Sequence, residues 1–125
     1  MLIVEDQEPM RSALREFLQA AYPQADIREA ADGARALELC SGPRLPLVLL
    51  DVGLPDANGI DLIPRIKALQ PDSVIIVVSQ HTERAYAERA RAAGAFAYVN
   101  KGAIYRELLP AIAEGLRVAP GGERA

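Results

Sequence analysis

The chain of 125 residues contains one cysteine and no tryptophan. A lone Cys40 excludes an intrachain disulfide, which suits a reducing compartment. The longest purely aliphatic run, residues 74–78, is far shorter than a membrane span. The first residues include the acidic Glu5 and Asp6 and lack the basic and then apolar pattern of a signal peptide. We therefore expect a cytoplasmic protein that does not enter a membrane.

The excess of negative over positive charge is also small. A net charge of −3 gives no electrostatic reason to expect that this domain binds nucleic acid. Half of the residues are hydrophobic and a quarter are charged, as in an ordinary globular protein, and the length suits one domain with its own core. Only Lys67 and Lys101 among the 14 basic residues are lysines, so each lysine position is informative.

Hydrophobic runs alternate with segments of helical periodicity. The predicted strands are residues 2–4, 26–30, 45–50, 73–78 and 95–99. The predicted helices are residues 10–21, 33–40, 59–69, 83–93 and 104–118. Thr82 is the expected cap of the fourth helix, and Pro64 is expected to bend or break the third. Five strands that alternate with five helices predict an α/β domain with a parallel sheet and helices on both faces.

Polar residues follow four of the predicted strands. Right-handed crossovers bring the carboxyl ends of all the strands to one edge, where open α/β sheets bind their ligands. The residues at these ends are Glu5 and Asp6, Asp51, Ser79, and Lys101. Three carboxylates, a hydroxyl and an ammonium are therefore expected to converge there.

This set of groups suits phosphoryl transfer. Three carboxylates repel one another unless a cation neutralises them, and Mg²⁺ prefers oxygen ligands of this kind. One carboxylate can then act as a nucleophile toward phosphorus and form an aspartyl phosphate. An ammonium and a hydroxyl, here Lys101 and Ser79, can stabilise the transferred group.

The whole pattern resembles the receiver domain of two-component response regulators, over nearly the full length. The matching stretches are Glu5-Asp6, Asp51 with "VGLPDANG", Ser79 after "VIIVV" and Lys101 after "AYVN". The resemblance implies a flavodoxin-like (βα)5 fold, with a doubly wound five-stranded sheet in the order 2-1-3-4-5. It implies that Asp51 accepts a phosphoryl group from a sensor histidine kinase and catalyses its own phosphorylation and dephosphorylation. The chain is not expected to be a metabolic enzyme.

The resemblance also assigns roles around Asp51. Asp6, Asp51 and the carbonyl of Gly53 are implied to hold Mg²⁺ or Mn²⁺, with Glu5 acting through water. Ser79 and Lys101 are implied to contact the phosphoryl group, and Ser79 and Tyr98 to move as a switch. The residues expected at the rim of the site are Val52, Gln80 and His81.

Two positions depart from the family pattern. Gly102 follows Lys101 where many receivers have proline, and Gln80 follows Ser79 where a small residue is usual. Within the family, the stretches "VGLPDANGIDLI" and "VNKGAIYRELLPAIAEGLRVAPGG" are most similar to receivers of LuxR-type transcriptional regulators. We therefore expect a receiver at residues 1–118, a tail or linker at 119–125, and a DNA-binding output domain outside this chain. Homodimerisation on phosphorylation is a further expectation.

Each residue also has an ordinary interpretation. An acidic pair after a strand is often a solvated turn, Asp51 can cap a turn, and Tyr98 can be a core aromatic. A degenerate receiver that only binds a partner is the main alternative. A haloacid dehalogenase-type phosphatase needs an acid at position 53, which is glycine. A nucleotide- or flavin-binding domain needs a phosphate loop after the first strand, where "EDQEP" is acidic and lacks glycine.

Overall fold

The computed structural model describes residues 1–119, and its centre is a five-stranded parallel sheet. The strands run in the order β2-β1-β3-β4-β5. Their bounds are β1 Leu2–Val4, β2 Arg28–Ala30, β3 Leu47–Leu50, β4 Val74–Ser79 and β5 Ala97–Asn100. The predicted α/β class and the flavodoxin-like order 2-1-3-4-5 are confirmed.

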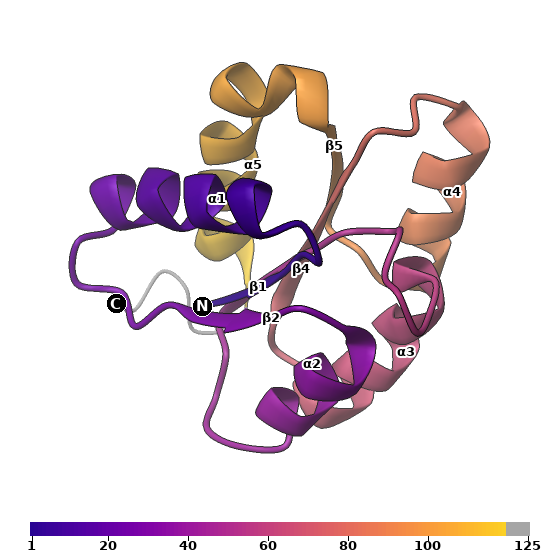
Figure 1. The fold of residues 1–125 in the computed structure, drawn as a ribbon, viewed down its shortest axis with the longest axis horizontal. Helices are drawn as coiled ribbons and strands as arrows, with labels where there is room; N and C mark the ends of the chain where they lie inside the picture. The colour runs from indigo at the N-terminus through magenta and orange to yellow at the C-terminus, as the bar shows by residue number, and fades with distance from the viewer. Residues whose placement is uncertain (120–125) are drawn as a thin grey trace.

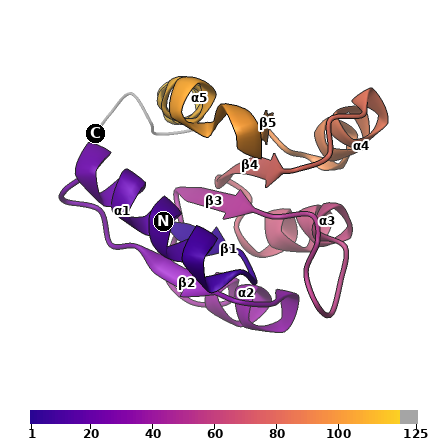
Figure 2. The ribbon, with the colours of Figure 1, turned by 45° about the horizontal axis from the view of Figure 1, so that its top comes forward.

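Five helices cover the two faces of the sheet. Their bounds are α1 Glu8–Ala21, α2 Gly33–Cys40, α3 Gly59–Leu69, α4 Arg84–Ala93 and α5 Ile104–Val118. Figure 1 shows α1 and α5 along one side of the strands and α2 and α3 along the other, and Figure 2 shows the same layers from a second angle. Because every strand is parallel, each crossover helix has to return across a face, which leaves the carboxyl ends of the strands at one edge.

The two hydrophobic clusters explain why the central strands β1 and β3 are apolar throughout. In β1, Leu2 and Val4 pack into the cluster that contains Ala36 of α2 and Ile63 of α3. The residue between them, Ile3, packs into the cluster on the α1 and α5 side. Successive side chains of a strand point to opposite faces, so the central strands of a sheet with helices on both faces need hydrophobic residues at every position, whereas the edge strand β2 carries Arg28 and Glu29.

The start of α4 differs from the sequence prediction. Thr82 is not the cap, because α4 begins at Arg84 and Glu83 occupies the N-cap position without a side-chain hydrogen bond. The amide N–H of His81 donates to Ser79 Oγ over 3.0 Å, and the carbonyl of His81 accepts from the Tyr98 hydroxyl over 2.7 Å. The helix therefore begins one residue later than predicted, and the backbone of His81, just before it, is held by Ser79 and Tyr98.

Pro64 does not break α3, which is continuous from Gly59 to Leu69. The proline is exposed, whereas Ile63 and Ile66 are fully buried. Its missing N–H therefore lies on the solvent side, while the buried face keeps the helix against the sheet. The strand bounds differ from the predicted ones by at most two residues.

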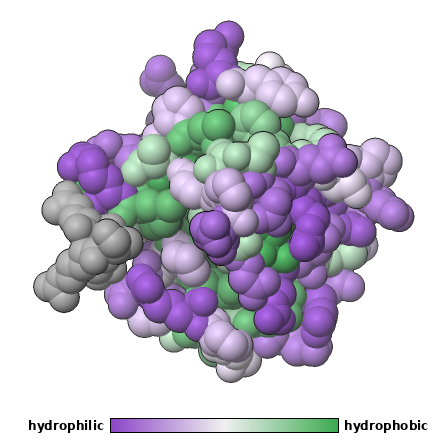
Figure 3. Space-filling view, turned by 90° about the vertical axis from the view of Figure 1, so that its left-hand side faces the viewer, coloured by the Kyte–Doolittle hydropathy of each residue, from purple (hydrophilic) through white to green (hydrophobic). Residues whose placement is uncertain are grey.

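Figure 3 views the left-hand side of Figure 1 and shows hydrophobic surface between hydrophilic side chains. In α5, Tyr105 is 83% exposed, yet its ring meets Phe17 of α1 edge-on at a centroid distance of 5.3 Å. Tyr105 therefore helps to join α1 to α5 despite its exposure. No helix within residues 1–119 is both long and hydrophobic enough to span a membrane.

Candidate functional site

The sheet itself fixes the backbone at the ends of β1 and β3. The N–H of Glu5 donates to the carbonyl of Ala30 over 3.0 Å, and the N–H of Asp51 donates to the carbonyl of Val4 over 3.0 Å. The parallel hydrogen-bond ladder therefore continues one residue beyond the strands. The sheet therefore determines the backbone positions from which the side chains of Glu5 and Asp51 extend.

Three carboxylates meet at this edge. Glu5, Asp6 and Asp51 each offer an oxygen, and these oxygens all lie within 4.8 Å of one another. Glu5 and Asp51 are 1% and 9% exposed, so their charges are largely removed from water. Such a cluster needs a positive charge to balance it.

Lys101 supplies one positive charge. Its Nζ lies 2.7 Å from Glu5 Oε1 and 3.5 Å from Asp51 Oδ1. Burial on its own lowers the pKa of Lys101, but the hydrogen bond with Glu5 and the two negative charges outweigh it, so the pKa is raised. Burial raises the pKa of Glu5, and its bonds to Lys101 and Gln7 oppose this only in part. One ammonium thus leaves the three acids incompletely neutralised.

The donor set fits a small divalent cation. All three side chains offer carboxylate oxygens, which hard cations such as Mg²⁺ prefer. Both oxygens of Glu5 already accept hydrogen bonds, one from Lys101 and one from the N–H of Gln7 over 3.1 Å. Asp6 is partly exposed, and its one side-chain contact among the described residues is a weak 3.4 Å bond from the Gln7 amide. Asp6 and Asp51 are therefore the side chains best placed to ligate a cation directly.

A short loop follows Asp51 and returns to it. Gly53 pairs with Asn58 in an isolated bridge, and the N–H of Gly59 donates to the carbonyl of Val52 over 2.7 Å. A Cβ at Gly59 would lie only 2.0 Å from the carbonyl oxygen of Asp51, so no other residue fits there. Val52 is buried, and its side chain packs into the cluster that contains Ile63. Gly53 is exposed, with open space around it.

Asp56 connects this loop to α2, a contact that the sequence analysis missed. Its two oxygens accept the N–H groups of Gly33 and Ala34 over 2.8 and 3.0 Å. These bonds lower the pKa of Asp56. They also satisfy two of the unpaired N–H groups at the start of α2. The only signal in the sequence is that Asp56 lies within the motif after Asp51.

Ser79 and Tyr98 both bond to the backbone of His81. Ser79 is buried at the end of β4, and its Oγ accepts the N–H of His81. Tyr98 donates its hydroxyl to the carbonyl of His81, and burial raises the pKa of this tyrosine, so it stays a donor. The exposed His81 ring stacks on Tyr86 with centroids 4.2 Å apart. The backbone of His81 thus links the two residues to which the resemblance assigns a switch role.

The turn after β5 explains how glycine replaces the usual proline. Lys101–Ala103 form a 3-10 turn, and the side chain of Asn100 accepts the N–H of Gly102 over 2.8 Å. A proline at position 102 would lack this N–H. Asn100 also donates to the carbonyl of Gln80 over 3.4 Å, while the Gln80 side chain is exposed. The bond between Asn100 and the N–H of Gly102 thus spans Lys101 within the turn.

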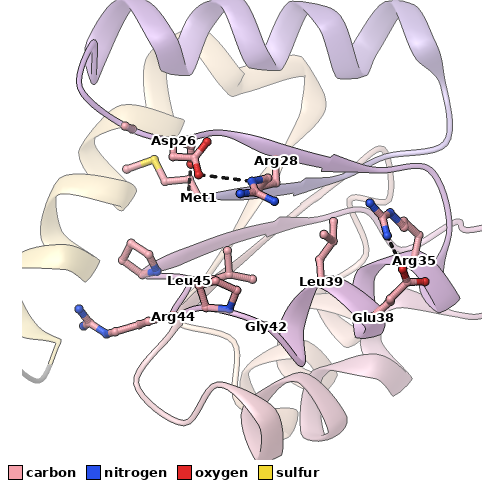
Figure 4. Close-up of a pocket in the computed structure, with 12 residues that line it drawn as sticks. Met1, Asp26, Arg28, Arg35, Glu38, Leu39, Gly42, Arg44 and Leu45 are labelled. Atoms are coloured by element: carbon pink, nitrogen blue, oxygen red, sulfur yellow. Dashed lines mark hydrogen bonds and ion pairs between the residues drawn. The ribbon is translucent and has the colours of Figure 1, made fainter.

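A pocket of about 300 Å³ lies at the opposite edge, beside the amino ends of the strands (Figure 4). Its lining includes Arg28, which pairs with Asp26 over 3.3 Å, and Arg35, which pairs with Glu38. None of the carboxylates of the acidic cluster lines it. The residues that the sequence analysis assigns to phosphoryl chemistry therefore lie away from this pocket.

Known proteins that are similar to this chain include response regulators. A family model described as the response regulator receiver domain matches residues 1–113. The transcriptional regulatory protein PdtaR of Mycobacterium tuberculosis is 38% identical over 114 residues, which cover 90% of this chain and 54% of PdtaR. The chain spans about half the length of PdtaR and of several other curated relatives that it matches.

Two solved structures have a similar fold. A Burkholderia pseudomallei response regulator, described with a phosphorylated aspartic acid, calcium ion and citrate, has a TM-score of 0.81 and 28% identity, covering 89% of this chain and 64% of that chain. A LuxR-family response regulator from Aurantimonas sp. SI85-9A1 has a TM-score of 0.80 and 28% identity, covering 90% and 81%. The resemblance predicted from the sequence is thereby confirmed. The chain belongs to the receiver domain family of two-component response regulators.

Proposed function

We propose that Asp51 accepts a phosphoryl group from a phosphohistidine of a sensor histidine kinase. The observation that carries this proposal is the meeting of Glu5, Asp6 and Asp51 beside an ammonium group, Lys101, at the carboxyl edge of the sheet. A carboxylate oxygen of Asp51 forms a bond to phosphorus as the bond from phosphorus to the imidazole nitrogen breaks. The electron pair of that bond returns to the imidazole. Hydrolysis then releases phosphate and restores the carboxylate.

In this proposal the cation is Mg²⁺ or Mn²⁺, held by Asp6, Asp51 and the carbonyl of Gly53, with Glu5 acting through water. When bound, the ion supplies positive charge that offsets the negative oxygens of the phosphoryl group. The engagement of both Glu5 oxygens with Lys101 and Gln7 supports an indirect role for Glu5. A related structure described with a phosphorylated aspartic acid also contains a calcium ion.

Lys101 would move from Glu5 toward the phosphoryl group on Asp51 and stabilise its negative charge. Its Nζ is closer to Glu5 than to Asp51, at 2.7 against 3.5 Å. New negative charge on Asp51 would draw the ammonium from Glu5 toward the phosphoryl oxygens. The raised pKa of Lys101 keeps it protonated for this role at neutral pH.

Ser79 and Tyr98 would carry the change outward. Ser79 Oγ accepts a hydrogen bond from His81, so its own O–H remains able to donate to a phosphoryl oxygen. A shift of Ser79 toward Asp51 would strain its bond to His81, whose carbonyl also holds Tyr98. The conformations with and without phosphate would then differ at the segment before α4, which is where a partner or second copy would detect the change.

The output we propose is transcriptional control, because PdtaR and other matched relatives are named as transcriptional regulators. Residues 1–118 would form the receiver, and 119–125 a tail or linker toward an output domain that binds DNA. Of that segment, residues 120–125 lie outside the described part of the chain.

Intact mass spectrometry after incubation with acetyl phosphate tests the proposal. We expect the protein to gain the mass of one phosphoryl group only when Mg²⁺ is present, and Asp51→Asn to gain none. Labelling of Asp51→Asn equal to that of the wild type would place the phosphate elsewhere. No gain in protein that demonstrably binds Mg²⁺ would overturn the phosphoacceptor role and favour the partner-binding alternative.

A further inference from the structure

Arg11 connects Glu5, the residue that follows β1, to Glu29 of β2. It lies on the first turn of α1, and its side chain is 18% exposed. Its Nη1 donates to the carbonyl oxygen of Glu5 over 2.9 Å, and its Nε donates to Glu29 Oε1 over 3.0 Å. One guanidinium thus bonds the backbone of an acidic residue and a carboxylate on the neighbouring strand. The fixed fork of donors makes this double contact specific to arginine.

The corner between β1 and α1 depends on these bonds, because its cap is weak. Gln7 occupies the N-cap position of α1 but makes no side-chain cap hydrogen bond. The corner is instead held by the Gln7 N–H on Glu5 Oε2 and by Arg11 on the carbonyl of Glu5. Arg11 is therefore the only residue outside the corner, among those described, whose side chain bonds its backbone.

Anchoring the carbonyl of Glu5 fixes where the next side chain begins. The peptide unit is planar, so the oxygen of Glu5 and the Cα of Asp6 belong to one rigid plane. Asp6 is partly exposed and has only a 3.4 Å contact with Gln7 to orient its own carboxylate. The position of Asp6 is then set mainly by its backbone, and Arg11 holds that backbone.

We propose that Arg11 is a positioning residue for the cation site, which it serves by fixing the peptide that carries Asp6. This inference depends on the proposed function, because it concerns the same cation. Contacts behind the ligands of a metal commonly change metal affinity by about 10- to 100-fold when they are removed. Arg11 is such a contact on the ligand backbone.

Arg15 offers a matched control on the same helix. Its Nη1 lies 2.6 Å from Glu29 Oε2, so it shares the carboxylate partner of Arg11. Its described contacts do not include Glu5. Arg11→Met and Arg15→Met each remove one positive charge and one ion pair with Glu29. Only the first also removes the bond to the backbone of Glu5.

The two explanations for Arg11 predict opposite changes in Mg²⁺ affinity when the residue is replaced. If Arg11 acted only as a charge, its loss would strengthen Mg²⁺ binding, because one repelling cation would be gone. If it positions Asp6, its loss weakens Mg²⁺ binding. We expect the dissociation constant of Mg²⁺ to rise about tenfold in Arg11→Met and to stay the same or fall in Arg15→Met.

Isothermal titration of the unphosphorylated protein with Mg²⁺ measures this difference without any reaction. Saturating Mg²⁺ should restore most of the acetyl phosphate labelling rate of Arg11→Met. Arg11→Lys, which keeps the charge but lacks the fork, should bind Mg²⁺ less tightly than the wild type and provides a milder change if Arg11→Met unfolds. Equal Mg²⁺ affinities of Arg11→Met and Arg15→Met would overturn the inference. Wild-type protein that binds no Mg²⁺ would instead overturn the proposed function.

Discussion

Replacing Gly59 by alanine should displace the backbone of Asp51. A Cβ at position 59 would lie 2.0 Å from the carbonyl oxygen of Asp51 and 2.9 Å from its carbonyl carbon. Real Cβ atoms essentially never approach other atoms within 3.0 Å, so the two backbones have to separate by about 1 Å. Neither atom belongs to a flexible side chain that can turn aside.

The separation has a cost that can be estimated. It opposes the 2.7 Å hydrogen bond from Gly59 to Val52 and the packing of Ile60, which is 4% exposed. Overpacking of this kind costs about 1–3 kcal/mol, and the helix preference of alanine returns at most about 1 kcal/mol. Because the clash involves only backbone, we expect a net loss of about 2–3 kcal/mol. The melting temperature should then fall by about 8–12 °C.

Gly53→Ala is the control, because it changes a glycine of the same loop. Nothing lies within 4 Å of a Cβ at Gly53, and among the described glycines only Gly94 has a positive φ. The new methyl group meets no atom and no backbone strain. Its unfolding free energy should stay within about 0.5 kcal/mol of the wild type or rise slightly, because alanine restricts the unfolded chain. The carbonyl of residue 53 is retained.

Urea unfolding followed by circular dichroism measures both variants, and labelling with acetyl phosphate and Mg²⁺ reports on the site. Gly59→Ala should label poorly even at a temperature where it is folded, whereas Gly53→Ala should label like the wild type. Equal unfolding free energies of the two variants would refute the steric reasoning. Normal labelling of a destabilised Gly59→Ala would show that the Asp51 carboxylate does not follow its carbonyl.

Two further perturbations test the charges around the loop. The bonds from Gly33 and Ala34 lower the pKa of Asp56 in the folded protein, so its charge stabilises the fold above the unfolded pKa, and this stabilisation is lost as the pH falls through the folded value. Asp56→Asn should therefore melt below the wild type at neutral pH, with the gap closing below about pH 4, and a gap that does not depend on pH would contradict this. Lys101→Met leaves Glu5 without its counter-charge and should cost about 2–3 kcal/mol, less than for a fully buried pair because Lys101 is 14% exposed. Saturating Mg²⁺ should reduce that loss in thermal melts, and an equal loss with and without Mg²⁺ would argue against a shared site.

The arrangement of the sheet could be predicted because it depends on regular elements. Uninterrupted hydrophobic strands such as Leu47–Leu50 need helices on both faces, and right-handed crossovers then fix which ends of the strands meet. The prediction that Thr82 caps α4 was wrong, and Pro64 does not break α3. Glu83 occupies the N-cap position without a side-chain hydrogen bond, so no capping side chain marks the start of α4, and solvent exposure makes the proline tolerable.

Separation along the chain does not decide which contacts of the site could be foreseen. Lys101 and Glu5 are 96 residues apart, yet their meeting follows from the rule that both residues end parallel strands. Asp56 and Gly33 are only 23 residues apart, and Arg11 and Glu29 only 18, yet neither contact could be predicted. Each of these contacts depends on how a loop or a long side chain crosses to another element, which periodicity does not encode. The residues with proposed chemical roles could therefore be predicted from their positions at the ends of strands, whereas the residues that hold them in place could be identified only from the structure.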